Sequence, residues 1–178
     1  RPGKIVLGRR NFFFKGKNAF CSLKGLSLLS GTSESYHHAV VNHEAPECTS
    51  RQLYKSILTD HARSEFNSLV HVYPNAQKSN SNQLNRNLLL SDSAHAFSRP
   101  QLKIYADDVQ ATHGSATGHL EKEELFYLRS RGLSTELARL MLIQGFADEI
   151  LEFIQPETIQ KKLRVSVQKD LEEIITKT

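Results

Sequence analysis

The feature that most constrains the fold is a change of pattern near Gly118. Before this residue, short apolar runs of strand length alternate with Gly, Pro, Asn and Ser; after it, apolar residues recur at steps of three and four. Many short strands with frequent turns are typical of a sandwich, a barrel or a parallel β-solenoid, and the later spacing is typical of amphipathic helices. The sequence predicts a mainly β fold with two units, a β unit over residues 1–118 and a helical subdomain over residues 119–178.

Within the β unit, the Asn-rich segment 75–87 favours the solenoid, because Asn tolerates left-handed backbone and its amide can satisfy backbone groups at tight corners. A polar loop would have the same composition, and no internal repeat is evident. Segment 52–66 fits either a short helix or polar strands, whereas segment 102–111 fits two strands around an Asp107-Asp108 corner. The strand-length runs are residues 5–7, 12–14, 39–41, 68–72 and 88–90.

Three helices are predicted in the last 60 residues. The first, 121–131, begins with acidic and ends with basic residues, and Gly132 follows at the position that favours left-handed backbone. Ser134 can cap the second helix, and Pro156 suits the first turn of the third. The expected apolar stripe of the second helix is Leu137, Leu140, Met141, Ala147, Ile150, Leu151 and Ile154.

Composition limits the class of protein. No apolar run approaches the roughly 20 residues of a membrane-spanning helix, so no membrane partner is expected. The chain begins Arg1-Pro2-Gly3-Lys4 without Met, which indicates a fragment of a longer protein. Two cysteines without CxxC spacing indicate a reducing, intracellular compartment.

The basic character of the chain lies in the β unit. Residues 1–118 hold 14 Lys/Arg and 8 Asp/Glu, whereas residues 119–178 hold 9 and 11. No aromatic motif or recognition helix of a nucleic-acid-binding protein accompanies these charges, so a solvated basic end is the favoured interpretation and no nucleic-acid partner is expected. A basic nucleic-acid-binding module remains an alternative. Six of the basic residues stand in the first 17 positions: Arg1, Lys4, Arg9, Arg10, Lys15 and Lys17.

Enzymatic motifs are absent from the sequence. It has no phosphate-binding Gly loop, no GxSxG and no HExxH, so hydrolysis of ATP by this chain is not expected. A carbohydrate-active β-solenoid enzyme would need paired carboxylates facing one groove. Asp107 and Asp108 are the obvious pair, but neighbouring strand residues point to opposite faces.

The most distinctive segment, 104–118, contains a His113-Gly114-Ser115-Ala116 motif, and the distinctive pattern continues through 125–133. Together with segments 43–55, 76–78, 83–92 and 145–149 and with Ala138, it closely resembles the SufB/SufD family of iron–sulfur cluster assembly proteins, on its SufD side. The similarity covers about residues 37–155. It implies the C-terminal part of a right-handed parallel β-helix followed by helices, in a bacterial cytoplasmic protein.

The resemblance also implies a function and partners. Such a chain is a non-catalytic scaffold that pairs with SufB through the β-helix and binds the ATPase SufC through the C-terminal helices. It binds no cofactor tightly by itself, but the complex holds a transient iron–sulfur cluster or iron. The residues expected to dock SufC are Leu125, Phe126, Tyr127, Arg129, Arg131, Gly132, Ala138, Gly145, Phe146 and Glu149.

His113 matches the family histidine that is implied to hold the nascent cluster or iron near SufB. A neutral imidazole can ligate such a metal. Val109, Ala111 and His113 share strand parity, so a core-facing Val109 would leave His113 partly sheltered. The alternative is a hydrogen-bonded histidine that closes the last coil. Cys48 is a second sulfur or metal contact or, more simply, a buried core thiol. The isolated fragment is expected to self-associate through its open coil or through the strands that would meet SufB.

Overall fold

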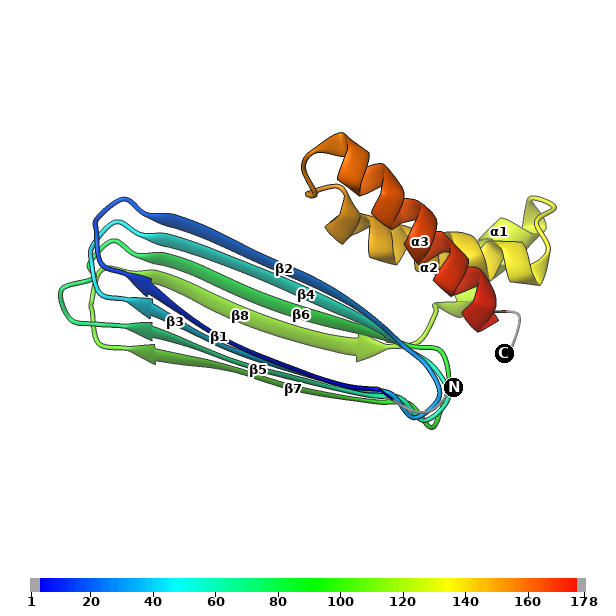
Figure 1. Cartoon of the computed structure of the whole chain (residues 1–178), viewed down its shortest axis with the longest axis horizontal. Helices are drawn as coiled ribbons and strands as arrows, with labels where there is room; N and C mark the ends of the chain where they lie inside the picture. The colour runs from blue at the N-terminus through cyan, green and yellow to red at the C-terminus, as the bar shows by residue number, and fades with distance from the viewer. Residues whose placement is uncertain (1–3, 176–178) are drawn as a thin grey trace.

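The β unit forms two parallel four-stranded sheets that face each other. The computed structural model describes residues 4–175, so Arg1 of the basic N-terminal group lies outside the described residues. Figure 1 shows the two sheets side by side along the long axis, with the helices at one end. One sheet has the order β1-β3-β5-β7, and comprises β1 (Ile5–Phe14), β3 (Glu34–His43), β5 (Arg63–Val72) and β7 (His95–Ile104). The other has the order β2-β4-β6-β8, and comprises β2 (Phe20–Leu29), β4 (Thr49–Leu58), β6 (Asn80–Leu89) and β8 (Gln110–Gly118).

The chain alternates between the sheets, so that every two strands complete one coil of a parallel β-helix. Paired residues of successive coils lie 29 to 32 positions apart, and all six strand pairs are parallel. The predicted solenoid is confirmed, and residues 4–175 form neither a sandwich of antiparallel strands nor a closed barrel. The repeat is not evident in the sequence, because equivalent positions of successive coils keep the same inward or outward orientation but not the same residue type.

Burial along each strand follows the period of two that a pleated strand imposes. In β4, Ser50, Gln52 and Tyr54 are buried, whereas Arg51 and Leu53 between them are half-buried. The interior between the sheets is apolar at both corners and polar in the middle. One corner contains Phe14, Val41, Cys48, Val70 and Val72, and the other contains Leu29, Leu58, Ala62 and Ala94.

The corners of the coils use left-handed backbone at repeating positions. Asn18, Glu47 and Lys78 have φ near +60° at one corner of successive coils, and Gly31 and Asp60 do so at the other. The expectation that the 75–87 asparagines form tight corners was therefore wrong in its details. Four of them lie in β6, where their amides bond to side chains or backbone of neighbouring positions: Asn80, Asn82, Asn85 and Asn87.

Long strands replace several of the predicted short ones. Runs 5–7 and 12–14 belong to the single strand β1, and segment 52–66 holds no helix but the end of β4 and the start of β5. The two strands predicted around Asp107 and Asp108 are confirmed as β7 and β8. Pro100 lies in β7, the edge strand of its sheet, where its missing N–H is tolerated.

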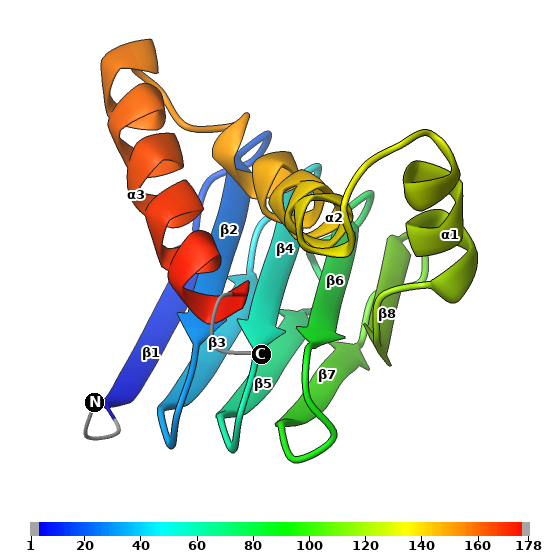
Figure 2. The same cartoon turned by 90° about the vertical axis from the view of Figure 1, so that its right-hand side faces the viewer.

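The three predicted helices are present: α1 (Lys122–Ser130), α2 (Thr135–Leu151) and α3 (Glu157–Ile175). Gly132 has φ +92° after α1, and the Ser134 hydroxyl accepts from the Leu137 N–H to cap α2. α2 packs on β2 and β4 and contacts both α1 and α3, and Figure 2 shows it lying between these two helices. Among residues 4–175, no helix is long and apolar enough to cross a membrane.

The predicted stripe is confirmed in the second half of α2, where Ala147, Ile150 and Leu151 are buried, but the buried residues of the first half differ from it. Leu137 and Met141 are about half exposed, whereas Ala138 and Ile143 are fully buried. Ile143 packs with Ile57 of β4, because α2 rests on the outer face of the sheet. The position of the sheet relative to α2 therefore determines which face of the helix is buried.

Candidate functional site

His113 lies on β8, at the C-terminal end of the β-helix. Its register partner on β6 is Gln83, which is fully buried, so His113 and Gln83 share the inward side of the sheet. The expected parity with Ala111 is confirmed, because Ala111 pairs with the buried Ser81. His113 is nevertheless exposed, since the strand order places no strand beyond β8 in residues 4–175. The partial shelter expected for His113 is not found.

A chain of polar side chains runs through the interior toward His113. The Gln83 Nε2 donates to Ser68 Oγ (3.2 Å), and Ser68 Oγ donates to Gln52 Oε1 (2.8 Å). All three residues are buried at 1 % exposure or less. The Gln83 Oε1 and the Gln52 Nε2 have no hydrogen-bond partner within the described residues. The unpaired Gln83 Oε1 therefore lies in the interior, on the strand that neighbours His113 and at the paired position.

The described residues do not form a metal site by themselves. In residues 4–175, no group of three or more His, Cys, Asp or Glu is placed to hold a metal ion. Cys48 is fully buried, and its thiol donates to the Gly16 and Pro46 carbonyls at 3.3 and 3.4 Å. The Cys48 thiol is therefore hydrogen-bonded within the apolar core, at the corner that contains Phe14. His113 offers one imidazole, and a tetrahedral site takes about four ligands.

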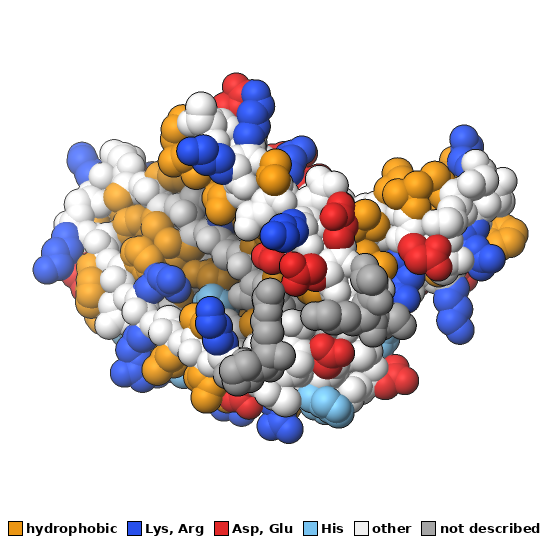
Figure 3. All heavy atoms as spheres, turned by 45° about the vertical axis from the view of Figure 1, so that its right-hand side comes forward, with side chains coloured by type: hydrophobic (Ala, Val, Ile, Leu, Met, Phe, Trp, Pro, Cys, Tyr) orange, Lys and Arg blue, Asp and Glu red, His pale blue; other side chains and the backbone are white. Residues whose placement is uncertain are grey.

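The residues predicted to dock the ATPase divide into two groups. The first lies on α1, which has no buried residue. Phe126 and Tyr127 are 72 % and 55 % exposed, and the Arg131 guanidinium lies over the Tyr127 ring at 4.6 Å. Leu125 is half-buried, and Arg129 and Gly132 are exposed. In Figure 3, the α1 region projects from the molecule, and hydrophobic and basic side chains lie side by side on it.

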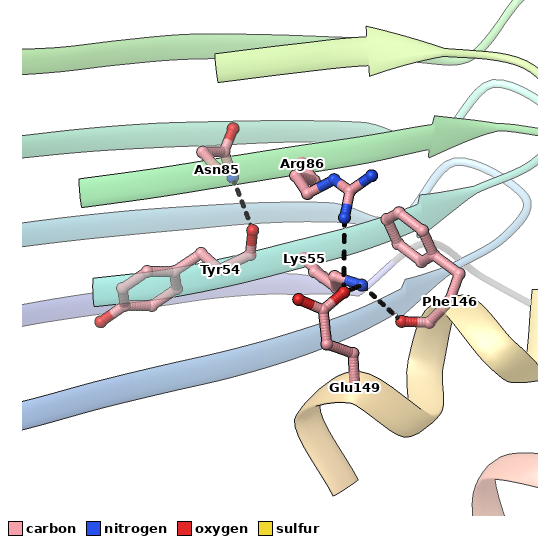
Figure 4. Close-up of polar contacts among 6 residues, drawn as sticks. All are labelled: Tyr54, Lys55, Asn85, Arg86, Phe146 and Glu149. Carbon is pink, nitrogen blue, oxygen red and sulfur yellow. Dashed lines mark hydrogen bonds and ion pairs between the residues drawn. The ribbon is translucent and has the colours of Figure 1, made fainter. Parts of the chain in front are cut away.

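The second group lies on α2 and faces the sheet. Lys55 of β4 is 2 % exposed, and its Nζ donates to the Phe146 carbonyl (2.9 Å) and pairs with the Glu149 carboxylate. Its ammonium also lies 4.1 Å from the centroid of the Phe146 ring. Arg86 of β6 reaches the same carboxylate at 3.4 Å. Figure 4 shows these contacts, which we call the α2 latch: Lys55, Arg86, Phe146 and Glu149.

The remaining predicted docking residues differ in access. Ala138 is fully buried, whereas Gly145 is exposed, and a Cβ added there would meet nothing within 4 Å. The carboxylate pair Asp107-Asp108 lies in the exposed turn between β7 and β8.

Sequence reasoning missed Gln83, Ser68 and the basic half of the α2 latch. One signal was available: Lys55 and Arg86 are register partners, as are Gln52 and Gln83. Both pairs are 31 residues apart, a spacing that marks a coil repeat. No local sequence pattern indicates that these residues contact α2 or Ser68.

The architecture is that of a parallel β-helix with a helical C-terminal end. The family model "SUF system FeS cluster assembly, SufBD core domain" matches residues 2–146. The chain belongs to this SufBD core family. It is similar to the iron-sulfur cluster assembly protein SufD of Escherichia coli, with 34% identity over 161 residues that cover 90% of the chain.

Other relatives support the same assignment. An iron-sulfur cluster assembly SufBD family protein of Synechocystis is 42% identical over 142 residues, which cover 80% of the chain. A SufD protein of Plasmodium berghei is 36% identical over 140 residues, or 78% of the chain. The chain spans only part of these relatives: 38% of the E. coli protein, 31% of the Synechocystis protein and 10% of the Plasmodium protein.

Proposed function

We propose that this chain is the C-terminal part of a non-catalytic SufD-type scaffold, which pairs with SufB and docks the SufC ATPase during iron–sulfur cluster assembly. Membership of the SufBD core family supports the assembly role. The observation that carries the finer assignment is the position of His113, exposed on a free edge strand at the end of the β-helix. The two free cysteines favour the reducing bacterial cytoplasm as its compartment.

The free edge of β8 supports pairing with a second β-helix. Unpaired backbone groups at a sheet edge are a ready template for another strand. A strand added there would lie about 4.8 Å from β8 and would bring its own side chains beside His113. Since His113 supplies one ligand, SufB would supply the others for the iron or cluster, which is the cargo of the complex.

The exposed aromatic residues of α1 support docking of SufC. Tyr, Phe and Arg are enriched at the energetic centres of protein interfaces. Phe126, Tyr127 and Arg131 form such a combination, and Met141 on α2 is about half exposed. The α2 latch residues Phe146 and Glu149 contribute to docking indirectly, because they fix α2 on the sheet.

The metal role is tested with His113→Ala in the full-length protein, purified with SufB and SufC. We expect an intact complex that retains several-fold less iron. The matched control is His119→Ala, which removes another exposed histidine beyond the end of β8. Iron content equal to that of wild type would remove His113 from the mechanism, and loss of SufB from the complex would make its role structural.

The docking role is tested by replacing Phe126 and Tyr127 together by Ser. Because both rings are already exposed, the fold should remain stable, whereas co-purification of SufC should fall at least tenfold. Val165→Ser is the control, since Val165 is 68 % exposed on α3. Undiminished SufC binding by the double variant would contradict docking through α1.

A further inference from the structure

We infer that α3 clamps a further coil of the β-helix: a strand that pairs with the outer side of β2 runs beneath α3 and fills the groove between this helix and the sheet. The occupant is a segment of the same longer chain that precedes β1. The inference goes beyond the proposed function, since neither His113 nor α1 takes part in it. Three observations carry it, namely the groove, the uncovered part of α3, and the free side of β2.

The groove lies between α3, the end of α2 and the outer face of β2, and its volume is about 540 Å³. β2 contributes Ser22, Lys24 and Leu26 to it, and α3 contributes Leu163 and Val167. The lining is aliphatic or aromatic except at Ser22 and Lys24. Apolar side chains of this kind gain stability when they are removed from water and closely packed, so the groove favours an occupant with apolar side chains.

The apolar face of α3 is buried along only part of its length. Leu171 is fully buried and Ile174 is 7 % exposed, and both pack in the cluster that contains Ile57 of β4. Leu163 lies on the same face nearer the start of the helix and is 41 % exposed. Figure 2 shows α3 on the opposite side of α2 from α1, toward β2, which is the outer strand of its sheet. The uncovered part of α3 therefore borders the groove where the sheet of residues 4–175 ends.

A strand beside β2 is the occupant that satisfies the groove and the sheet together. β2 pairs with β4 on one side, and no strand of residues 4–175 pairs with its other side. Unpaired backbone groups at a sheet edge are a template for a further strand, which lies about 4.8 Å from its neighbour. Every second side chain of that strand points to the outer face of the sheet, and so toward α3. A helix or a small molecule in the groove would leave the β2 backbone groups unpaired.

The spacing of the coils identifies the chain that supplies the strand. Paired residues of β2 and β4, of β4 and β6, and of β6 and β8 lie 29, 31 and 30 positions apart, always in parallel. The strand beside β2 thus belongs to the segment about 30 residues before it, as in any solenoid of stacked coils. Val6 of β1 supports the same coil: it pairs with the buried Ser35 and so faces the interior, yet it is 51 % exposed. The E. coli SufD protein is long enough to contain such a coil, since the matched residues make up 38% of it.

The consequence is a mechanical role for α3. In a solenoid each coil contacts only its neighbours, so the coils near an end depend on additional contacts. With the further strand in place, α3 packs on that strand through Leu163 and on the cluster with Ile57 through Leu171. One rigid helix then spans several coils and opposes their separation.

The first test measures whether position 163 is covered in the full-length protein. Leu163→Cys and the matched control Val165→Cys are alkylated with iodoacetamide, and the modification of each is followed by peptide mass spectrometry. The exposed fractions of Leu163 and Val165 in residues 4–175, 41 % and 68 %, differ less than twofold. We expect Leu163→Cys to react at least about tenfold more slowly, because a covered thiol reacts only during local opening. Rates that differ less than twofold would overturn the inference.

The second test needs no variant. Hydrogen exchange of the full-length wild-type protein, recorded where light scattering shows a monomer, should find the amides of β2 as slow to exchange as those of β4, because both strands are then paired on two sides. A group of β2 amides that exchanges much faster than those of β4 would overturn the inference. Protection of β2 that develops only as the protein associates would assign the groove to a second copy and would overturn it as well. Neither readout involves iron or SufC, so failure of the proposed function would leave both results unchanged.

Discussion

At the residue scale, burial favours the neutral form of two histidines, the fully buried His43 and the half-buried His37. His43 is fully buried, its Nε2 lies 2.9 Å from Ser50 Oγ, and its ring packs 4.6 Å from the Phe14 ring centroid. Burial lowers the pKa of His43 to about 4. Burial and the nearby Arg10 also lower the pKa of His37. Neutral histidines thus serve as hydrogen-bonding members of the core.

The depressed pKa of His43 predicts acid sensitivity. Since the unfolded chain binds the proton with a pKa near 6.5, stability is complete above this value and falls as pH drops toward about 4. The contribution of His43 to this loss is about 3 kcal/mol. In His43→Gln, urea unfolding measured between pH 7 and pH 4 should show a correspondingly smaller slope. An unchanged slope would contradict the prediction.

A second residue-scale prediction concerns the close packing of Gly25 on β2. A Cβ at this position would lie 2.7 Å from Tyr54 Cδ1, and the Tyr54 ring is itself packed 5.0 Å from Phe66. Gly25→Ala should therefore destabilise the chain by about 1–3 kcal/mol through overpacking. Gly16→Ala, where a Cβ meets nothing within 4 Å, should be neutral or slightly stabilising. Equal denaturation midpoints for the two variants would contradict this prediction, because they would show that the Tyr54 ring moves aside without a cost in stability.

At the scale of the elements, the α2 latch joins the helices to the sheet. The Lys55 ammonium is buried, whereas the side chain of Glu149 is 43% exposed. The two partners therefore differ in what their removal leaves behind. Without Lys55, the carboxylate can be solvated and can keep Arg86; without Glu149, a cation remains buried with one carbonyl and one ring.

This asymmetry predicts that Glu149→Leu costs more stability than Lys55→Met. Breaking a buried pair so that one charge remains buried costs about 3–5 kcal/mol, whereas replacing both partners by apolar residues is often nearly neutral. The double variant should consequently be more stable than Glu149→Leu alone. Chemical denaturation of the four proteins measures this cycle, and a double variant less stable than either single variant would refute it.

The helices themselves follow from local signals, and their docking does not. Acidic residues begin α1, Gly132 ends it and Ser134 caps α2, so these helices could be placed from the sequence. The buried residues in the first half of α2 could not be placed in this way, because Leu137 and Ala138 are both compatible with an apolar stripe. Contact with Ile57 on β4 decides which residues are buried.

At the scale of the whole molecule, the described residues have β1 and β2 as the outer strands at one end of the two sheets and β7 and β8 at the other. The N-terminal edge is the more apolar: Ile5 and Leu7 of β1 are 73 % and 71 % exposed, and Phe20 of β2 is 68 % exposed. At the other end, Phe97 of β7 is 62 % exposed. Exposed apolar edges favour association with other chains.

We predict that the isolated 178-residue chain self-associates, mainly through β1 and β2. Light scattering should show species larger than a monomer at high concentration. Leu7→Lys combined with Phe20→Lys should reduce their population, because a charge on an edge strand opposes pairing. Phe97→Lys at the opposite end is the control. A clean monomer for wild type, or a stronger effect of Phe97→Lys, would contradict the predicted edge.

The sequence by itself determined the change from strands to helices near Gly118, the helix caps at Gly132 and Ser134, and the likeness of the His113 region to a family. These properties depend on neighbouring residues and short periodicities. Only the tertiary structure decided that Gln83 lies beside His113, and that Lys55 meets Glu149 from 94 positions away. Coil register and helix docking are set by packing between distant segments, and no local pattern of residues specifies them.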